Sequence, residues 1–183
     1  MSTQVNNYAR GKTAPASELT NLLGVEKWFN DDYVTTIPQT RRSGLKAKCR
    51  WVKNDSGGTL TARQAVKYKA AFWGLYVGDQ ADVGDKADGI VDEFVGTVAN
   101  GEHFWLVVEG VTECISDGNG ALAQGDVVCT VGTGTGKVRL QVAAPADTTA
   151  AMVQVNSRLG TVLETIAAVD GTTGRIYLDA HTH

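Results

Sequence analysis

The sequence predicts an all-β protein, a small antiparallel β-barrel or a sandwich of hairpins. Short segments that alternate apolar and polar residues follow one another from about residue 41 to the end, and glycine-rich turns separate them. The chain has 21 glycines and only 3 prolines, so its turns depend on the positive φ that glycine tolerates. Helical periodicity is almost absent from the same region.

The N-terminal part differs from the rest, and we divide the chain into residues 1–40 and a β-rich domain, residues 41–183. Residues 1–14 are polar and aperiodic, which predicts a flexible arm. The next segment, PASELTNLLGVEKWF, predicts a short helix with Ser17 as its N-cap, and Gly24 limits that helix to about two turns.

The clearest strand is LKAKCRWV, residues 45–52. Leu45, Ala47, Cys49 and Trp51 point to one side, and Lys46, Lys48 and Arg50 point to the other. Further strands follow, and Asn100-Gly101 between two apolar runs predicts a two-residue hairpin.

Two segments of the chain echo one another. GGTLTARQAVKY and GNGALAQGDVVCT share a Gly-x-Leu step with a valine-containing strand a few residues later. An ancient duplication would give this pattern, and so would the same turn chemistry used twice. For a match this short, we favour the second explanation.

Composition indicates an ordinary globular protein. Of the 183 residues, 43% are hydrophobic and 20% are charged, which suits one domain of good size or two small ones. No apolar run approaches the roughly 20 residues that a membrane helix needs, and the first residues lack the apolar core of a signal peptide. Cys49, Cys114 and Cys129 are widely spaced, which favours buried free thiols made in a reducing cytoplasm.

Charge is distributed unevenly along the chain. Residues 1–70 carry 12 Lys and Arg against 5 Asp and Glu, a net charge of +7, whereas residues 71–183 carry 5 against 15, a net charge of −10. Such a chain can attract copies of itself or a charged scaffold, and its two halves can also neutralise each other within the fold.

The most enzyme-like motif is the glycine run CTVGTGTGKVRL, residues 129–140. A phosphate-binding loop requires a glycine where Val131 stands and a Ser or Thr where Val138 stands. A dinucleotide fingerprint fails because Lys137 occupies the place of its third glycine. Both motifs must also open a helix, and KVRLQVA alternates like a strand. The run is therefore expected to form a hairpin tip.

No other motif predicts catalysis or a metal site. His181 and His183 lie near the chain end with no third ligand nearby, and His103 stands beside a turn. Four acids repeat every three residues without the spacing of a calcium loop, which favours a solvated acidic loop: Asp79, Asp82, Asp85 and Asp88. Glu109 and Glu113 lie four apart, as ordinary surface acids also do. We expect neither an enzyme nor a cofactor.

A basic segment is the best candidate binding site. RRSGLKAKCRWVK contains no acid and six basic residues: Arg41, Arg42, Lys46, Lys48, Arg50 and Lys53. Aromatic residues are not interleaved with them on the basic side, so a contact with a protein surface is favoured over nucleic acid. A solvated strand face is the alternative. The tryptophans Trp28, Trp51, Trp73 and Trp105 could line a sugar-binding platform, but such residues more often fill a β core, and Trp105 in HFWLVVEG is expected to be buried.

Residues from about Lys48 to His181 resemble the capsid decoration, or cement, proteins of tailed bacteriophages. The segments that carry the resemblance are CRWVKNDSGGTLTARQAVKY, GIVDEFVGTVANGEHFWLVVEGVTECISDG, GALAQGDVV and RLGTVLETIAAVDGTTGRIYLDAH. The shared features are a strand that ends in Asn-x-Ser-Gly, a Trp-x-Val-Val-x-Gly strand, a Gly-Asp-x-Val turn and a final pair of strands with Leu-Gly. These are turn and strand signatures rather than catalytic motifs.

The resemblance implies a structural virion protein, made in the cytoplasm of a bacterial host, that binds the outer capsid surface and stabilises the expanded head. Its implied partners are the major capsid protein, copies of itself in a homotrimer, and neighbouring decoration subunits, with no nucleic acid and no membrane. The family has no catalytic residues to carry over. The main alternative is a head-fibre or tail-associated module that binds a host glycan, and a tryptophan exposed beside the acidic loop would favour it. A carbohydrate hydrolase on a β-sandwich is a further alternative.

Overall fold

A computed structural model of the chain describes residues 13–14, 22–30, 46–82, 84–131, 135–141, 149, 152 and 157–179. It confirms the all-β prediction. The strands, in chain order, are β1 Glu26–Asn30, β2 Lys46–Asn54, β3 Leu60–Thr61, β4 Ala65–Tyr68, β5 Tyr76–Gln80, β6 Gly89–Val91, β7 Thr97–Val98, β8 His103–Ile115, β9 Val127–Val131, β10 Lys137–Leu140, β11 Arg158–Val162 and β12 Thr173–Asp179. A 3₁₀ turn, η3, covers Ala70–Phe72 between β4 and β5. No helix among the described residues is long and apolar enough to cross a membrane.

Five strands close into a first barrel. Within the large sheet the order β2-β5-β4-β6-β8 returns to β2, because β2 also pairs with the first half of β8. The short pair β3–β7 lies against this barrel as a separate two-stranded sheet. The apolar side chains that fill it form one buried cluster, whose largest fully buried members are Phe104, Leu60 and Leu106. Because both ends of the sheet meet, most of the unpaired strand edge is removed.

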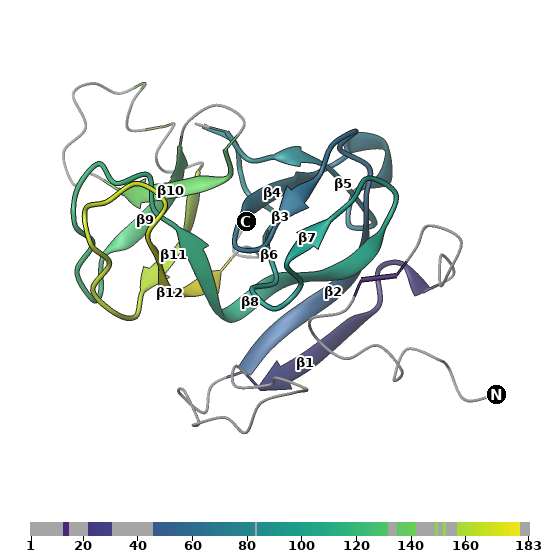
Figure 1. Cartoon of the computed structure of the whole chain (residues 1–183), viewed down its shortest axis with the longest axis horizontal. Helices are drawn as coiled ribbons and strands as arrows, with labels where there is room; N and C mark the ends of the chain where they lie inside the picture. The colour runs from purple at the N-terminus through teal and green to yellow at the C-terminus, as the bar shows by residue number, and fades with distance from the viewer. Residues whose placement is uncertain are drawn as a thin grey trace.

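The second half of β8 begins a second barrel (Figure 1). Its order is β8-β12-β11-β9-β10, and a parallel bridge between Ser116 and Val138 joins β10 back to the end of β8. Its interior holds Leu159, Ile176 and Leu178, all fully buried. Strand β8 therefore serves both barrels, which lie side by side in Figure 1 with β8 passing between them.

The two barrels are repeats of one unit. The run β2-β3-β4-β5-β6-β7-β8 corresponds to β8-β9-β10-β11-β12, with the bridge Leu122–Ile166 in place of the β3–β7 pair. Three backbone hydrogen bonds of the first unit have equivalents in the second, each from an N–H to a carbonyl oxygen. In the first unit they run from Gly101 to Asn54, from Asp55 to Val77 and from Val91 to Gln64. In the second unit they run from Gly171 to Ser116, from Asp117 to Val138 and from Val162 to Asp126. The two similar sequence segments, GGTLTARQAVKY and GNGALAQGDVVCT, occupy equivalent positions in these units. The structural repeat therefore extends well beyond one shared turn.

A second apolar layer covers the outer wall of the first barrel. Phe29 from β1 packs edge-on against Trp105, with ring centroids 5.3 Å apart, and Trp105 packs against Trp51. His103 stacks on Trp51, and the backbone of Ala14 exchanges two hydrogen bonds with His103. This layer explains why β2 buries side chains on both of its faces.

The N-terminal predictions need one correction. Most of the predicted helix, and residues 1–12 of the predicted arm, lie outside the described residues. Residue 14 is not part of a flexible arm, because Ala14 is buried and paired with β8. Glu26–Asn30, which lies beyond the predicted end of the helix at Gly24, is a strand that pairs with β2. The long-range contact of Phe29 with Trp105 stabilises this strand.

The two turn predictions have different outcomes. Asn100-Gly101 does form a turn, since Glu102 N–H donates to Ala99 O, but it does not join a hairpin. The strand before it, β7, pairs with β3, whereas β8 pairs with β2, β6 and β12. The glycine run is confirmed as a hairpin connection, because β9 and β10 pair on either side of it. The three cysteines are free and buried, as expected.

Candidate interaction surface

The structure separates the predicted basic residues into two groups. Lys46, Lys48 and Arg50 lie on one face of β2, as the alternation predicts, and Lys53 lies on the opposite face because its position has the other parity. Arg41 and Arg42 lie outside the described residues. The basic segment therefore does not form one continuous charged stripe in the described part of the chain.

Glu26 from β1 neutralises much of the charge on the first group. Its carboxylate lies 2.7 Å from Lys48 Nζ and 2.6 Å from an Arg50 guanidinium nitrogen. Burial by itself raises the pKa of Glu26, but the hydrogen bonds from Lys48 and Arg50 outweigh burial and lower that pKa below its ordinary value. The carboxylate therefore stays ionised and fixes both cations on the β1–β2 ribbon.

Trp28 lies on this same face. It stands opposite Lys48 in the antiparallel pair, and its side chain is 50% exposed. Residues directly opposite each other in a sheet share a face. We call Glu26, Trp28, Lys46, Lys48 and Arg50 the β1–β2 face.

We call the segment between β4 and β5, residues 69–75, hairpin 1. Arg50 links the β1–β2 face to this hairpin. Its guanidinium donates to the Tyr68 hydroxyl at 3.2 Å, and lies 5.7 Å from the Tyr68 ring and 5.9 Å from the Trp73 ring. Burial raises the pKa of Tyr68 to about 12, although Arg50 opposes that shift. Tyr68 thus remains a neutral donor and acceptor beneath the exposed ring of Trp73.

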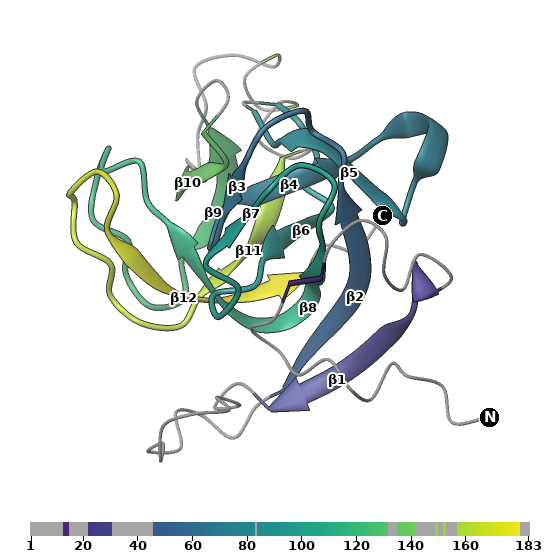
Figure 2. The same ribbon diagram turned by 45° about the vertical axis from the view of Figure 1, so that its right-hand side comes forward.

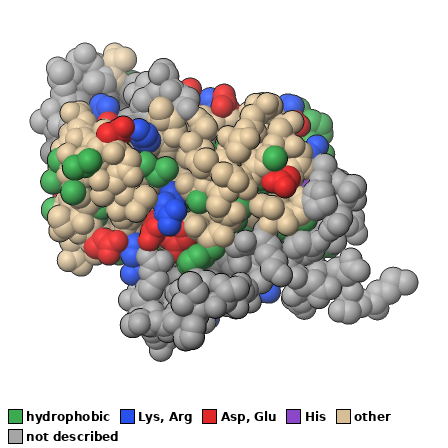
Figure 3. All heavy atoms as spheres, in the orientation of Figure 1, with side chains coloured by type: hydrophobic (Ala, Val, Ile, Leu, Met, Phe, Trp, Pro, Cys, Tyr) green, Lys and Arg blue, Asp and Glu red, His purple; other side chains and the backbone are tan. Residues whose placement is uncertain are grey.

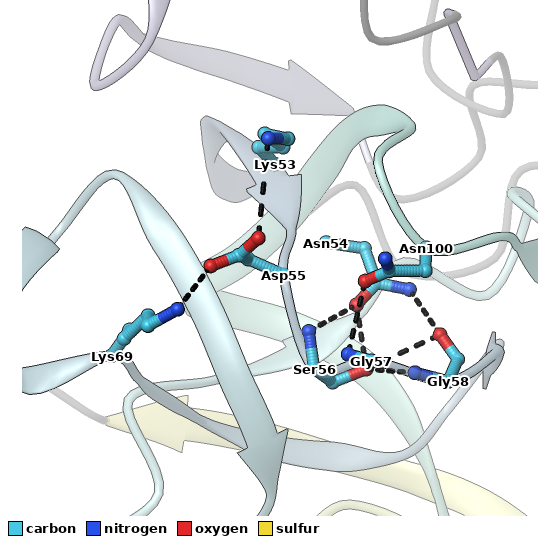
Figure 4. Close-up of polar contacts among 8 residues, drawn as sticks. All are labelled: Lys53, Asn54, Asp55, Ser56, Gly57, Gly58, Lys69 and Asn100. Atoms are coloured by element: carbon cyan, nitrogen blue, oxygen red, sulfur yellow. Dashed lines mark hydrogen bonds and ion pairs between the residues drawn. The ribbon is translucent and has the colours of Figure 1, made fainter.

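The other side of hairpin 1 carries a second group of cations and aromatic rings. Lys53 Nζ lies 5.0 Å from the centre of the Tyr76 ring, which stacks on Phe72 at 4.5 Å. Figure 4 shows the Asp55 carboxylate between Lys53 and Lys69, at 4.0 Å and 2.5 Å. Hairpin 1 is therefore braced on both sides by a cation and an aromatic ring.

The tip of hairpin 1 exposes large apolar side chains. Phe72 is 44% exposed and Trp73 is 63% exposed, and residues 69–71 are also exposed. The equivalent connection in the second barrel, residues 132–136, is made of glycine and threonine. Because the repeat closes without aromatic residues there, folding of the barrel does not require them in hairpin 1.

The signature Asn-x-Ser-Gly serves the fold rather than a binding site. Figure 4 shows Asn54 at the centre of a turn, where its amide donates to the carbonyl oxygen of Gly58 at 2.9 Å. The same amide also donates to the carbonyl oxygen of Val98 in β7 at 2.9 Å. Its side-chain oxygen accepts from the backbone N–H and the hydroxyl of Ser56. Gly57 donates to the Asn100 side chain. Each of these groups is hydrogen-bonded within the turn or to the neighbouring strand β7.

Several of the other candidate residues have structural partners. Asp85 pairs with Lys67 at 2.7 Å, Asp88 accepts from Tyr68 N–H, and Asp79 accepts from Gln80 N–H. Glu113 pairs with Arg63. Among the described residues no three His, Cys, Asp or Glu side chains gather as a metal site. His181 and His183 lie outside the described residues.

The tryptophans divide into two buried and two exposed side chains. Trp51 and Trp105 are buried, which confirms the expectation for Trp105, and Trp28 and Trp73 are exposed. Trp73 packs on the ring of Tyr68, whose backbone N–H donates to the Asp88 carboxylate at the end of the acidic loop. An exposed tryptophan therefore lies near one end of that loop.

Charges of both signs intermingle on the face shown in Figure 3. The ion pairs Arg63–Glu113 and Lys67–Asp85 join the basic first part of the chain to its acidic remainder. The uneven charge of the sequence is thus partly neutralised by folding.

Sequence reasoning missed Phe72, Tyr76 and Trp28 as surface residues. Trp28 lies beyond Gly24, where the predicted helix ends, in a stretch to which no element was assigned, and the apolar run AAFWGLYV resembles a buried strand. The available signal was the repeat, because aligning the two units places AAFWG opposite the glycine run.

Comparisons with known proteins identify no family. No family model matches the chain, and no curated protein matches it. A solved structure, the N base of the head fiber protein gp8.5 in bacteriophage phi29, aligns with 12% sequence identity and a TM-score of 0.47. The alignment covers 72% of this chain and 93% of that one. At this TM-score, nothing about the function of this chain follows from the likeness.

Proposed function

We propose that this chain is a structural protein of a tailed-phage virion that binds the outer surface of the icosahedral capsid and stabilises the expanded head. The observation that carries the proposal is the β1–β2 face, where the half-exposed Trp28 lies among fixed cations. The sequence resemblance to decoration proteins gives the class of partner, the major capsid protein. The role involves no catalytic step.

The chemistry of this face suits a protein partner. Exposed tryptophan and arginine side chains are enriched at the centres of protein interfaces, where they contribute most of the binding energy. Glu26 fixes Lys48 and Arg50, so little side-chain entropy is lost when the face is covered. Lys46, which is exposed at the start of β2, adds a positive charge that can attract an acidic capsid surface.

Self-association belongs to the same proposal. The resemblance implies a homotrimer on the outer capsid surface, in contact with neighbouring decoration subunits. A trimer would present three β1–β2 faces to the shell, so individually weak contacts would act together.

Binding to purified phage heads that lack this protein tests the proposal. We expect saturable co-sedimentation, with about one copy or fewer per major capsid subunit, and weaker binding as salt rises. Trp28→Ala should lower the affinity at least tenfold, as loss of an interface tryptophan typically does. Tyr177→Ala, which removes an exposed aromatic side chain from the second barrel, is the matched control and should bind normally. Absence of binding by the unaltered chain would overturn the proposal.

A head-fibre or tail-associated module that binds a host glycan is the second candidate. The exposed rings of Trp28 and Trp73 favour it, because sugars stack on such rings. A change in tryptophan fluorescence on adding a host glycan, lost in Trp73→Ala, would support this candidate in place of capsid binding.

A further inference from the structure

The contact between the two barrels is made by the connection between β9 and β10. Gly136 O accepts a hydrogen bond from Ala65 N–H at 2.8 Å, and Thr135 O accepts from the Gln64 side chain at 3.3 Å. Thr130 of β9 donates to Asp85 O at 2.8 Å. Hairpin 2, residues 132–136, thus docks through its described end on the turn that precedes β4, residues 61–65, which we call the first turn.

The second barrel has an equivalent of the first turn. In the first turn, Thr61 N–H donates to the Gln64 side chain at 2.9 Å. In residues 123–127, which we call the second turn, Ala123 N–H donates to the Asp126 side chain at 2.7 Å. Both turns lead into equivalent strands, β4 and β9. Each unit therefore has one hairpin and one turn, equivalent to the hairpin 2 and first turn that contact each other within the chain.

Among the residues that the structure describes, one of the two possible hairpin–turn contacts is made within a single chain. Hairpin 2 docks on the first turn, where Ala62 is buried and Arg63 and Gln64 are partly buried. Residues 123–125 of the second turn are exposed, and so is the tip of hairpin 1. Figure 2 shows why they do not meet: the β4–β5 connection projects at the right of the molecule, and the loops around β12 project at the left.

We propose that hairpin 1 of one copy docks on the second turn of another copy, so that the chain assembles head to tail through a repetition of its internal barrel–barrel contact. Charge supports this pairing. Hairpin 1 carries the exposed Lys69, which shares the single Asp55 carboxylate with Lys53 and leaves a net positive charge, whereas the second turn carries Asp126 with the exposed Glu164 near it. Glu164 lies two residues before Ile166, which bridges to Leu122 beside the second turn.

Such a contact joins different surfaces of the two copies, so it closes into a ring or continues as a filament. In a ring, first and second barrels would alternate, and Phe72 and Trp73 would be covered at each junction between copies. The inference goes beyond the proposed function by naming the surfaces through which copies of the chain associate. Self-assembly is tested without capsids, so failure of this inference would not contradict capsid binding. Failure of capsid binding would likewise not contradict self-assembly.

The test measures the mass of the full chain in solution by light scattering during size-exclusion chromatography. We expect a concentration-dependent oligomer for the unaltered chain. Trp73→Ala should disable the hairpin 1 surface and Ala123→Arg the second-turn surface, and each variant alone should be monomeric. Mixed in equal amounts, they should form a dimer and nothing larger, because each variant retains the surface that the other lacks.

Trp28→Ala, the loss of an exposed tryptophan outside hairpin 1, is the matched control and should assemble normally. Circular dichroism and thermal melting establish that each variant is folded. A monomeric unaltered chain, unchanged assembly of Trp73→Ala, or a mixture that stays monomeric would overturn the inference.

Discussion

Gly110 allows β8 to serve two barrels. Its φ is +94°, in the left-handed region that favours glycine, and a Cβ there would lie 2.1 Å from Lys46 O. Strand β8 pairs with β2 from His103 to Gly110 and with β12 from Glu109 to Ile115, so both partners meet at Gly110. The glycine of the Trp-x-Val-Val-x-Gly signature is therefore required by a close approach of two strands.

The substitution Gly110→Ala should destabilise the protein by at least about 3 kcal/mol, since it adds a steric collision with backbone to the cost of a left-handed alanine. Gly57→Ala is the matched control, because Gly57 has a φ of +80° with nothing near its Cβ position. It should cost only about 1 kcal/mol. Urea unfolding followed by circular dichroism measures both, and equal losses would contradict the account.

At the level of individual residues, the sequence predicts alternation better than exposure. The two-residue alternation in the sequence correctly predicted that Lys48 and Arg50 share one face, because the alternation of side chains is a local property of a strand. Whether Trp73 is buried depends on which segment lies over it, and that is decided by pairings distant in the sequence. The contacts of Arg50 with Glu26 and Tyr68 are of the same kind, so the candidate surface could not be assembled from the segment alone.

At the level of elements, β1 shows how tertiary contacts decide secondary structure. Its residues follow a segment with helical spacing, yet it pairs along five residues with β2. Ion pairs on one face and the packing of Phe29 on the other hold it there. The strand character of β2, β8 and β12 was predictable because each is long and is either alternating, as in β2 and β12, or largely apolar, as in β8. The pairing of β7 with β3 was not predictable, because each has only two residues.

The stability that Glu26 contributes should depend on pH. Its pKa in the folded chain lies below the ordinary value of 4.5, so the contribution is present above that value and is lost as the pH falls through the folded pKa. At pH 7, Glu26→Gln should therefore lower the free energy of unfolding by less than about 1 kcal/mol, because the ion pair is partly exposed. The melting temperature should fall slightly as a result. The difference from the unaltered chain should vanish in acid.

Glu109→Gln is the matched control for this experiment, since the described part of the chain contains no ion pair to Glu109. Its melting temperature should follow that of the unaltered chain at both pH values. A Glu26→Gln difference that persists in acid would show that charge is not the cause.

At the level of the whole molecule, the two barrels are expected to unfold together. They share β8, and their contact includes the hydrogen bond from Ala65 to Gly136 and the ion pair Arg63–Glu113. The sequence predicted a barrel or sandwich but not two barrels, because the closing pairs β2–β8 and Ser116–Val138 join segments that are more than 20 residues apart. The repeat was visible only as a short echo, since equivalent positions rarely hold the same residue.

Weakening the contact should separate the two barrels. Gly136 has a φ of +61°, and a Cβ there would lie 2.7 Å from Ala65 O, so Gly136→Ala should push hairpin 2 off the first turn. We expect one calorimetric transition for the unaltered chain and a broadened or double transition for Gly136→Ala. Gly171→Ala, with a φ of +81° and nothing near its Cβ position, is the matched control and should keep a single transition at a slightly lower temperature. Two transitions in the unaltered chain would mean that the shared strand and the hairpin 2 contact together do not couple the barrels. One sharp transition in Gly136→Ala would mean that the shared strand couples them without hairpin 2.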